Sequence, residues 1–356
     1  MRKLILVGLA LLPGMLSAQP FPSDQVQKVL DKVVDQKRVF GAVISISQGD
    51  ETYHFASGNM QVDDAYFIAS VTKLYTASVL FKLADEGQLS LDDPITKYFP
   101  EETLNGLHVY EGTDYTAQIT LRHLVTNTSG LADYFMQEED AESLMETLTA
   151  NKDTALSFDQ MMAMTKGLPA QFAPGTPGKA YYSDGNFQML GQVIQQVTGK
   201  SLQEAYKAYI FQPLGLTETY VYDDPNDTRP INFYHKKDQL HIPLMMASFQ
   251  ADGGIVSTAG ENLTFLKAYL AGELFSHDQV DINSGWNKIY TPFQYGHGIM
   301  KFKFPGQPEM IGHAGASGSF AYYIPSADVF ITGTINQMAK PQIAYRLIAK
   351  VLSKVD

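Results

Sequence analysis

Apolar residues cover nearly every side of one predicted helix, which begins at Val71. They fall at Val71, Leu74, Tyr75, Ala77, Val79, Leu80, Phe81 and Leu83. A helix that is apolar all round is buried between two layers and does not lie on a surface. We expect it to end near Gly87, because glycine suits the C-terminus of a helix.

Other periodic segments predict a helix and strands first, then helices, then strands and a last helix. The first group is a helix over 24–36 and a hairpin with strands over 39–47 and 51–56. Helices are expected over 121–125, 141–148, 158–165, 187–197 and 202–211, the last ended by Pro213. Strands follow over 253–256, 300–304, 319–324 and 329–335, before a helix over 342–355.

This order predicts an α/β (α+β) fold in which helices flank one antiparallel sheet. Hairpin links between strands imply antiparallel pairing. We predict that residues 19–69 and 231–356, from both chain ends, form the α/β domain. Residues 70–230 would form an inserted, mainly helical domain, and a cleft at the junction would contain the start of the buried helix.

Residues 1–18 have the pattern of a secretory signal peptide. Arg2 and Lys3 precede the apolar run 4–12, and small residues follow at Ser17 and Ala18. A short membrane anchor is the alternative, although the run is too short to span a bilayer comfortably. The sequence has no cysteine, and therefore no disulfide framework. We expect a secreted or periplasmic protein without a stable membrane anchor.

The composition is that of an ordinary globular chain of 356 residues, 45% apolar and 18% charged. The formal net charge is −12, and loss of Arg2 and Lys3 with the signal peptide would make it −14. This acidity, with no basic run, argues against nucleic acid as a partner. The eight histidines include no His-x-His or His-Glu-x-x-His pair, which argues against a metallohydrolase.

Ser70 and Lys73 form a Ser-x-x-Lys pair at the head of the buried helix. Three residues apart, their side chains share one face. A serine hydroxyl is a weak nucleophile until a base takes its proton, and a desolvated lysine with a lowered pKa can be that base or activate one. Free N–H groups at the helix start would favour developing negative charge. The tetrapeptide alone is also compatible with a capping serine and a solvated lysine.

Two further segments offer the rest of such a site. Tyr181 and Tyr182 follow the turn-rich loop 174–178, and a tyrosine beside Lys73 could hold a lowered pKa and shuttle the serine proton. The glycine-rich segment 311–318 would let backbone N–H groups complete an oxyanion hole, with His313 as a donor or partial positive charge. Taken singly, these segments are also compatible with half-buried aromatics and with a glycine bulge beside a surface histidine.

Together the three segments resemble those of the serine β-lactamase and penicillin-binding-protein superfamily. The likeness is to its branch of class C β-lactamases, D,D-peptidases and related esterases. Similar segments occur over 119–131, 174–176 and 251–257, so the resemblance extends from about residue 40 to residue 335. It implies a mixed sheet plus a helical domain, and neither a metal nor another cofactor.

The resemblance also implies a role for each site residue. Ser70 would be the acylated nucleophile and Lys73 its activator, while Tyr182 opens the Tyr-x-Asn element and shuttles the proton. The N–H groups of Ser70 and Ala316 would form the oxyanion hole. The segment His313–Gly315 would lie on the edge strand of the sheet, where the family has Lys-Thr-Gly or His-x-Gly.

Two positions depart from the family pattern. Asp184 stands where asparagine is usual, and a carboxylate near Lys73 should favour the charged ammonium and oppose its use as a base. We therefore predict that Tyr182 carries more of the base role and that the pocket prefers a substrate with an N–H or ammonium donor. His313 replaces a lysine that holds a substrate carboxylate. Histidine is largely neutral at pH 7, which predicts weak penicillin turnover.

These features predict a secreted serine hydrolase, an esterase or D,D-peptidase, with a small-molecule or peptidoglycan-derived substrate. A penicillin-binding or muropeptide-binding sensor with little turnover is the alternative, because a fold does not fix a function. An α/β-hydrolase would need Gly-x-Ser-x-Gly, and residues 315–319 fail that frame at the last position.

Overall fold

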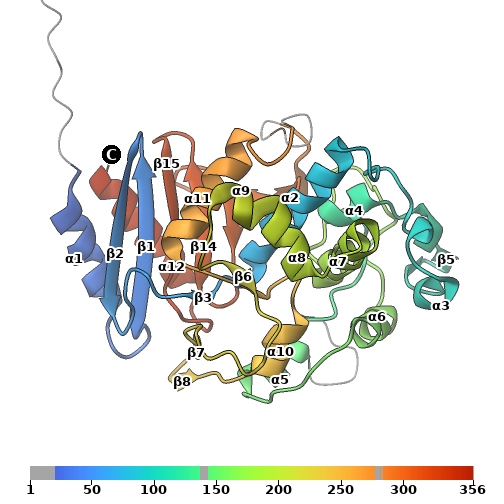
Figure 1. Cartoon of the computed structure of the whole chain (residues 1–356), viewed down its shortest axis with the longest axis horizontal. Coiled ribbons are helices and arrows are strands. Elements are labelled where there is room, and N and C mark those ends of the chain that lie inside the picture. Colours follow the sequence, from blue (N-terminus) through green and yellow to red (C-terminus); the bar gives the residue numbers. More distant parts are fainter. Residues whose placement is uncertain (1–20, 137–142, 277–280, 282–283, 356) are drawn as a thin grey trace, which may run out of the picture.

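The computed structural model describes residues 21–136, 143–276, 281 and 284–355 (Figure 1). The predicted signal peptide and the first residues of the helix predicted over 141–148 lie outside these ranges. Within the described ranges, no helix is both long and apolar enough to cross a membrane.

An eight-stranded antiparallel sheet forms one side of the molecule (Figure 1). Its strands run in the order β10-β11-β12-β13-β14-β15-β1-β2, so the two chain ends meet where β15 pairs with β1. The predicted α/β fold with an antiparallel sheet is therefore confirmed. The strands are β1 (Gly41–Gln48), β2 (Glu51–Gly58), β10 (Asn287–Tyr290), β11 (Phe293–Gly296), β12 (Ile299–Phe302), β13 (Met310–Ala314), β14 (Ser319–Ile324) and β15 (Val329–Thr334).

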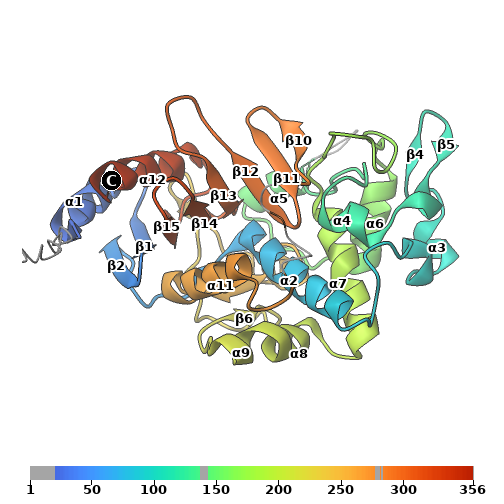
Figure 2. The same ribbon diagram turned by 90° about the horizontal axis from the view of Figure 1, so that it is seen from above.

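Helices cover both faces of this sheet (Figure 2). α1 (Ser23–Val33) and α12 (Gln342–Val355) pack on one face, where they share an apolar cluster with Ile44 and Ile46 of β1. α11 (Ala259–Ala271) packs on the other face, in a second cluster that includes Val43. Successive side chains of β1 point to opposite faces of the sheet, so this strand contributes to both apolar clusters. Each apolar side chain contributes roughly 1.5–3 kcal/mol to stability when it is fully buried.

Most of the other helices form a second body beside the sheet (Figure 2). They are α2 (Thr72–Asp85), α3 (Glu101–Leu104), α4 (Leu121–Val125), α5 (Leu144–Thr149), α6 (Phe158–Lys166), α7 (Asp184–Thr198), α8 (Leu202–Tyr206), α9 (Gln212–Leu214) and α10 (Pro243–Ser248). Short strands join them: β3 (Tyr66–Phe67), β9 (Ile255–Ser257) and β6 (Tyr220–Val221) in one sheet, and the pairs β4 (Val109–Tyr110) with β5 (Thr113–Asp114) and β7 (Tyr234–His235) with β8 (Asp238–Gln239). The domain boundaries at residues 69/70 and 230/231 stay a prediction.

α2 is buried as its all-round apolar pattern predicted. Every residue from Thr72 to Phe81 is buried, Lys73 included, and the helix packs against α7 and α8. It ends at Asp85, and Gly87 follows with a positive φ of 68° that closes the last turn. The helix start is therefore fixed from all sides by the core.

Two sequence-based expectations are wrong and one helix was not predicted. Pro213 does not end the helix that begins at Leu202, because a π-helical turn over Lys207–Phe211 lets the chain continue into α9, which Gly215 terminates. No element was predicted where α11 lies, although Thr258 accepts a hydrogen bond from the Glu261 amide as an N-cap. β13 is an interior strand and not an edge strand, because it pairs with β12 and β14.

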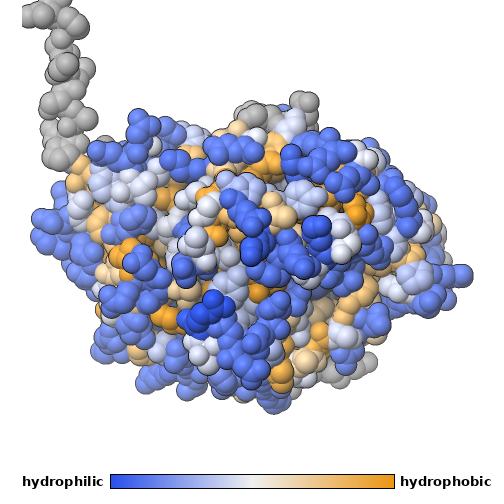
Figure 3. All heavy atoms as spheres, viewed as in Figure 1, coloured by the Kyte–Doolittle hydropathy of each residue, from blue (hydrophilic) through white to orange (hydrophobic). Residues whose placement is uncertain are grey.

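Hydrophilic side chains cover most of the face shown in Figure 3, with apolar side chains scattered among them. Scattered apolar residues are normal on a globular surface. This face offers no broad apolar patch, and the chemistry is expected in a cleft instead.

Candidate active site

Ser70 lies in a 3₁₀ turn, Ala69–Val71, immediately before α2. Ala69 has a φ of 46°, a left-handed conformation that costs a non-glycine residue energy and that persists only where the surroundings enforce it. The Ile68 amide donates to the Ile255 carbonyl, and the Ile255 amide donates to the Thr72 hydroxyl. The nucleophile predicted from sequence is thus held at the head of a buried helix.

The Lys73 ammonium has three hydrogen-bond acceptors, one for each of its N–H groups. It donates to Asp184 Oδ1, to the Asp252 carbonyl at 2.7 Å and to Ser70 Oγ at 3.4 Å. The side chain of Lys73 is 0% exposed. The structure therefore brings Ser70, Lys73 and Asp184 together, as the sequence predicted.

Lys73 does not have the lowered pKa that desolvation alone predicted. Burial lowers its pKa, but the carboxylates of Asp184 and Asp252 and the hydrogen bond to Asp184 outweigh burial and raise it. The ammonium form is therefore favoured, as expected from an aspartate at position 184. In this state Lys73 is a donor to Ser70 and not a base.

Asp133 and Asp252, which were not predicted as site residues, complete a buried carboxylate cluster around Lys73. Asp133 Oδ1 accepts from the Asp184 amide at 3.1 Å, and Asp252 Oδ2 accepts from the Tyr134 hydroxyl at 2.7 Å. Burial and the charge of Asp184 raise the pKa of Asp252 to about 7 and that of Asp133 well above its usual value. In the sequence each of the two is a single aspartate inside an apolar or glycine-rich segment, and a single aspartate does not indicate a cluster.

Tyr182 also reaches the site, from the turn before α7. Its ring lies 5.0 Å from Lys73 Nζ, and its buried hydroxyl has no hydrogen-bond partner among the described residues. Burial, followed by the charge of Asp184, raises its pKa well above 10, although the nearby Ser70 hydroxyl acts in the lowering direction. The two oxygens nevertheless form no hydrogen bond of regular geometry. The predicted phenolate is therefore wrong for this state, because burial and carboxylates outweigh the single cation.

The end of β13 approaches Ser70 closely. Ser317 Oγ donates to the Phe67 carbonyl at 2.8 Å and Ser319 Oγ to the Ile68 carbonyl at 2.6 Å, which ties this turn to the segment before the nucleophile. A Cβ on Gly315 would lie only 2.4 Å from the Ile68 carbonyl oxygen, so glycine is required there. Ala316 consequently lies beside Ser70 in the same cavity.

His313 lies behind the residues that line the cavity. It is 1% exposed, and its ring lies 5.9 Å from that of Tyr182. Its Nδ1 donates to the Ala314 carbonyl at 2.8 Å, which leaves Nε2 as an acceptor 3.5 Å from the Tyr295 hydroxyl. Burial and Lys73 lower its pKa to about 3. The histidine is therefore neutral, as predicted, but it carries no partial positive charge and does not line the cavity with Ser70.

A small cavity of about 50 Å³ opens at Ser70 and is lined mainly by apolar side chains. Asp184 and Asp252 supply its carboxylates. The apolar part is lined by Tyr134, Phe135, Leu148, Phe233, Met246, Phe249 and Met338. This arrangement suits a small acyl group whose apolar end points away from the carboxylates.

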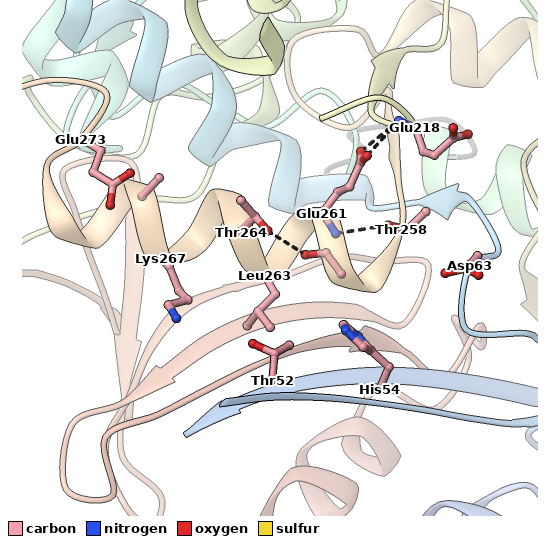
Figure 4. A pocket seen from close by; sticks show the side chains of 12 residues that line it. Thr52, His54, Asp63, Glu218, Thr258, Glu261, Leu263, Thr264, Lys267 and Glu273 are labelled. Carbon is pink, nitrogen blue, oxygen red and sulfur yellow. Dashed lines mark hydrogen bonds between the residues drawn. The ribbon is translucent and has the colours of Figure 1, made fainter. Parts of the chain in front are cut away.

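A larger hollow of about 870 Å³ lies elsewhere, between β2 and α11 (Figure 4). Figure 4 shows Thr52 and His54 of β2 facing Leu263 and Lys267 of α11. None of the residues predicted from sequence lines it, so its size does not make it the active site. Within the described residues, no group of His, Asp or Glu is arranged to hold a metal ion, and the aspartates around Lys73 are no exception.

Comparison with known proteins places the chain in a family. A family model described as Beta-lactamase matches residues 26–353. Esterase EstB of Burkholderia gladioli is 30% identical over 54% of this chain and 50% of its own length, so the match spans half of that esterase. The D-alanyl-D-alanine-carboxypeptidase/endopeptidase AmpH of Escherichia coli strain K12 is 25% identical over 85% of this chain and 77% of its own. A D-stereospecific amidohydrolase from Streptomyces superposes with a TM-score of 0.74 and 26% identity, over 91% of this chain and 97% of that one.

Proposed function

The chain belongs to the Beta-lactamase family, and from that premise we propose that it is a serine hydrolase acting through an acyl-enzyme on Ser70. The observation that carries the proposal is that Tyr182, from the turn before α7, lies beside Lys73, which contacts Ser70 at the start of α2, and that Ser70 itself lines a cavity. In the proposed reaction Ser70 Oγ attacks an ester or amide carbonyl. Its proton passes to the leaving group through Lys73 and Tyr182.

The Ser70 and Ala316 amides are the proposed oxyanion donors. Ala316 is held beside Ser70 by the serine contacts of the β13 turn, and within the described residues no acceptor is found for either amide. Free amides that converge on the position of a developing oxyanion are the arrangement that acyl transfer needs. This supports acyl transfer over simple binding.

The proposed substrate is a small ester or amide with an apolar acyl group, as for an esterase or D,D-peptidase. The apolar lining of the cavity supports it, and the relatives include an esterase and a carboxypeptidase. The neutral His313 gives a substrate carboxylate no cationic partner, which supports weak turnover of penicillin. We also propose that the protein is exported, on the pattern of residues 1–18.

A second candidate is a penicillin-binding or muropeptide-binding sensor with little turnover. One observation favours it, because the pKa of Lys73 and of Tyr182 is raised and neither group is a ready base for deacylation. Intact-mass measurement after fluorophosphonate or penicillin treatment separates the two candidates. If the protein is a hydrolase, both reagents label the wild type and neither labels Ser70→Ala. The penicillin adduct then decays with time, and an ester substrate prevents its formation. A persistent penicillin adduct without ester turnover would favour the sensor.

A further inference from the structure

Asp184 lies between the Lys73 ammonium and the cavity. One carboxylate oxygen, Oδ1, accepts from Lys73, while no hydrogen bond to Oδ2 is found within the described part of the chain. The side chain of Asp184 is 12% exposed, whereas that of Lys73 is 0% exposed. A group bound in the cavity can therefore reach the carboxylate of Asp184 but not the enclosed ammonium behind it.

The hydrogen bonds of Lys73 keep it from acting as a base. All three of its N–H groups point at acceptors, and the contact with Ser70 Oγ, at 3.4 Å, is the longest. A proton can move from Ser70 to Lys73 only after Lys73 has lost one. The negative charge of Asp184 and its hydrogen bond to the ammonium oppose that loss.

The groups around Lys73 leave Asp184 as its dominant charged partner. Burial, followed by the charge of Asp184, raises the pKa of Asp133 well above its usual value. The Asp252 carboxylate accepts from Tyr134, and it raises the pKa of Lys73 less than Asp184 does. The remaining neighbours that act on Lys73 or on the groups beside it are uncharged: Tyr182 before α7, Tyr295 on β11 and His313 on β13. A change at Asp184 therefore acts most directly on Lys73.

We propose that a substrate with an ammonium group next to its scissile carbonyl binds that ammonium at Asp184 and thereby releases Lys73 to act as the base. This rests on the proposed acyl-enzyme function and names its substrate class, the α-amino acyl esters and amides. When two cations share one carboxylate, each is held less strongly. A second positive charge close by disfavours the charged form of a neighbouring ammonium and so lowers its pKa.

The proton balance of the step is complete. Lys73 loses one proton to solvent water by way of the Asp184 carboxylate, which accepts from it and is partly exposed, and becomes a neutral amine. As the bond forms between Ser70 Oγ and the carbonyl carbon, that amine accepts the hydroxyl proton. The bond to the leaving group then breaks, and the proton passes through the Tyr182 hydroxyl to the departing oxygen or nitrogen. The products are the acyl-enzyme and the protonated leaving group.

The test compares the ethyl esters of D- and L-alanine with ethyl propionate, which lacks only the amino group. Acylation of the full chain is followed by quenched intact mass at pH 6, where the amino group is charged, over a range of ester concentrations. For at least one alanine enantiomer we expect a saturating acylation rate about tenfold or more above that of the des-amino ester. Each acylation rate is divided by the rate at which hydroxide hydrolyses the same ester, which corrects for the intrinsic reactivity of that ester.

The variant Asp184→Asn should remove this difference between the esters. Without the carboxylate, Lys73 is less strongly held, so acylation by the des-amino ester rises while the advantage of the ammonium ester is lost. Asp252→Asn is the matched control, because its side chain faces Tyr134 and its main-chain carbonyl still accepts from Lys73. It should keep the advantage of the ammonium ester. Thermal unfolding checks that both variants are folded.

The outcomes separate this inference from the proposed function. Two results would overturn the inference but not the proposed function. One is that the ammonium group changes only the half-saturating ester concentration and not the acylation rate. The other is that Asp184→Asn lowers the acylation rate equally for both esters. If neither the esters nor a fluorophosphonate acylates Ser70, the proposed function and the inference both fail. Should Asp252→Asn lose the advantage as fully as Asp184→Asn, release through Asp184 is also overturned.

Discussion

Replacing Lys73 by methionine should destabilise the protein, and more at high pH than at low pH. The substitution keeps the apolar stem in a fully buried position but removes the partner of Asp184 and the donor to the Asp252 carbonyl. Removal of one member of a buried ion pair costs about 3–5 kcal/mol. Unfolding entropy of roughly 2.1 cal/mol/K per residue gives about 0.75 kcal/mol/K for a chain of this length. A loss of about 3 kcal/mol then lowers Tm by about 4 °C.

The sign of the pH dependence follows from proton linkage. In Lys73→Met the Asp184 carboxylate is buried without its cation, and burial of an unpaired charge is costly, so the folded variant favours a proton there that the unfolded chain releases. The folded variant then holds more protons than the unfolded chain, and its stability falls as pH rises. The Tm deficit against wild type should therefore be larger at pH 8 than at pH 5.

Thermal or urea unfolding at both pH values measures these effects. The double variant Lys73→Met, Asp184→Asn is the control, because removal of both charges leaves no unpaired carboxylate and should recover at least about half of the loss. A variant as stable as wild type at pH 8, or a double variant worse than the sum of the two single ones, would refute this explanation of the ion pair.

Three further predictions concern the neighbours of the pair. His313→Gln should reduce the loss of stability that occurs as the pH falls from about 6.5 to about 3. In wild type the buried histidine has a lowered pKa, so over this range the unfolded chain binds a proton that the folded chain does not. Acid unfolding curves of the variant and wild type measure the difference. Tyr134→Phe should cost about 1.5–3 kcal/mol, the usual contribution of a hydrogen bond to a charged group, in urea unfolding above pH 7, where Asp252 is ionised. Fluorophosphonate labelling of Ser70 should accelerate steadily from pH 6 to pH 9, because Lys73 has a raised pKa and is a base only when deprotonated; a pH-independent rate would contradict this.

Much of the fold could be predicted because its elements follow simple periodicities. The all-round apolar α2, the amphipathic α12 and the β14–β15 hairpin each have one dominant pattern, and their positions match the prediction. α11 was missed because its apolar residues show little helical periodicity, and the N-cap at Thr258 was its remaining signal. The course of the chain through Pro213 depends on a π-helical turn, which sequence periodicity does not indicate.

The site could be predicted in its members but not in its electrostatics. Ser70, Lys73, Tyr182 and Asp184 meet as expected from their motifs. The raised pKa of Lys73 agrees with the prediction made from Asp184 and not with the prediction made from desolvation alone, while the pKa of Tyr182 shifts in the opposite direction from the predicted one. Both shifts depend on how many carboxylates the fold buries nearby. Asp133 and Asp252, as well as the interior position of β13, are set by tertiary packing between distant segments, and no local pattern encodes that.

The most direct test locates the acyl group during turnover. The protein is mixed with a short-chain p-nitrophenyl ester, quenched in acid within the burst phase, digested and mapped by mass spectrometry. We predict one acyl group, on the peptide that contains Ser70, and no burst with Ser70→Ala. An acyl group on another residue, or a burst that survives Ser70→Ala, would show that the crevice formed by α2, the turn before α7 and the end of β13 is not where the chemistry occurs.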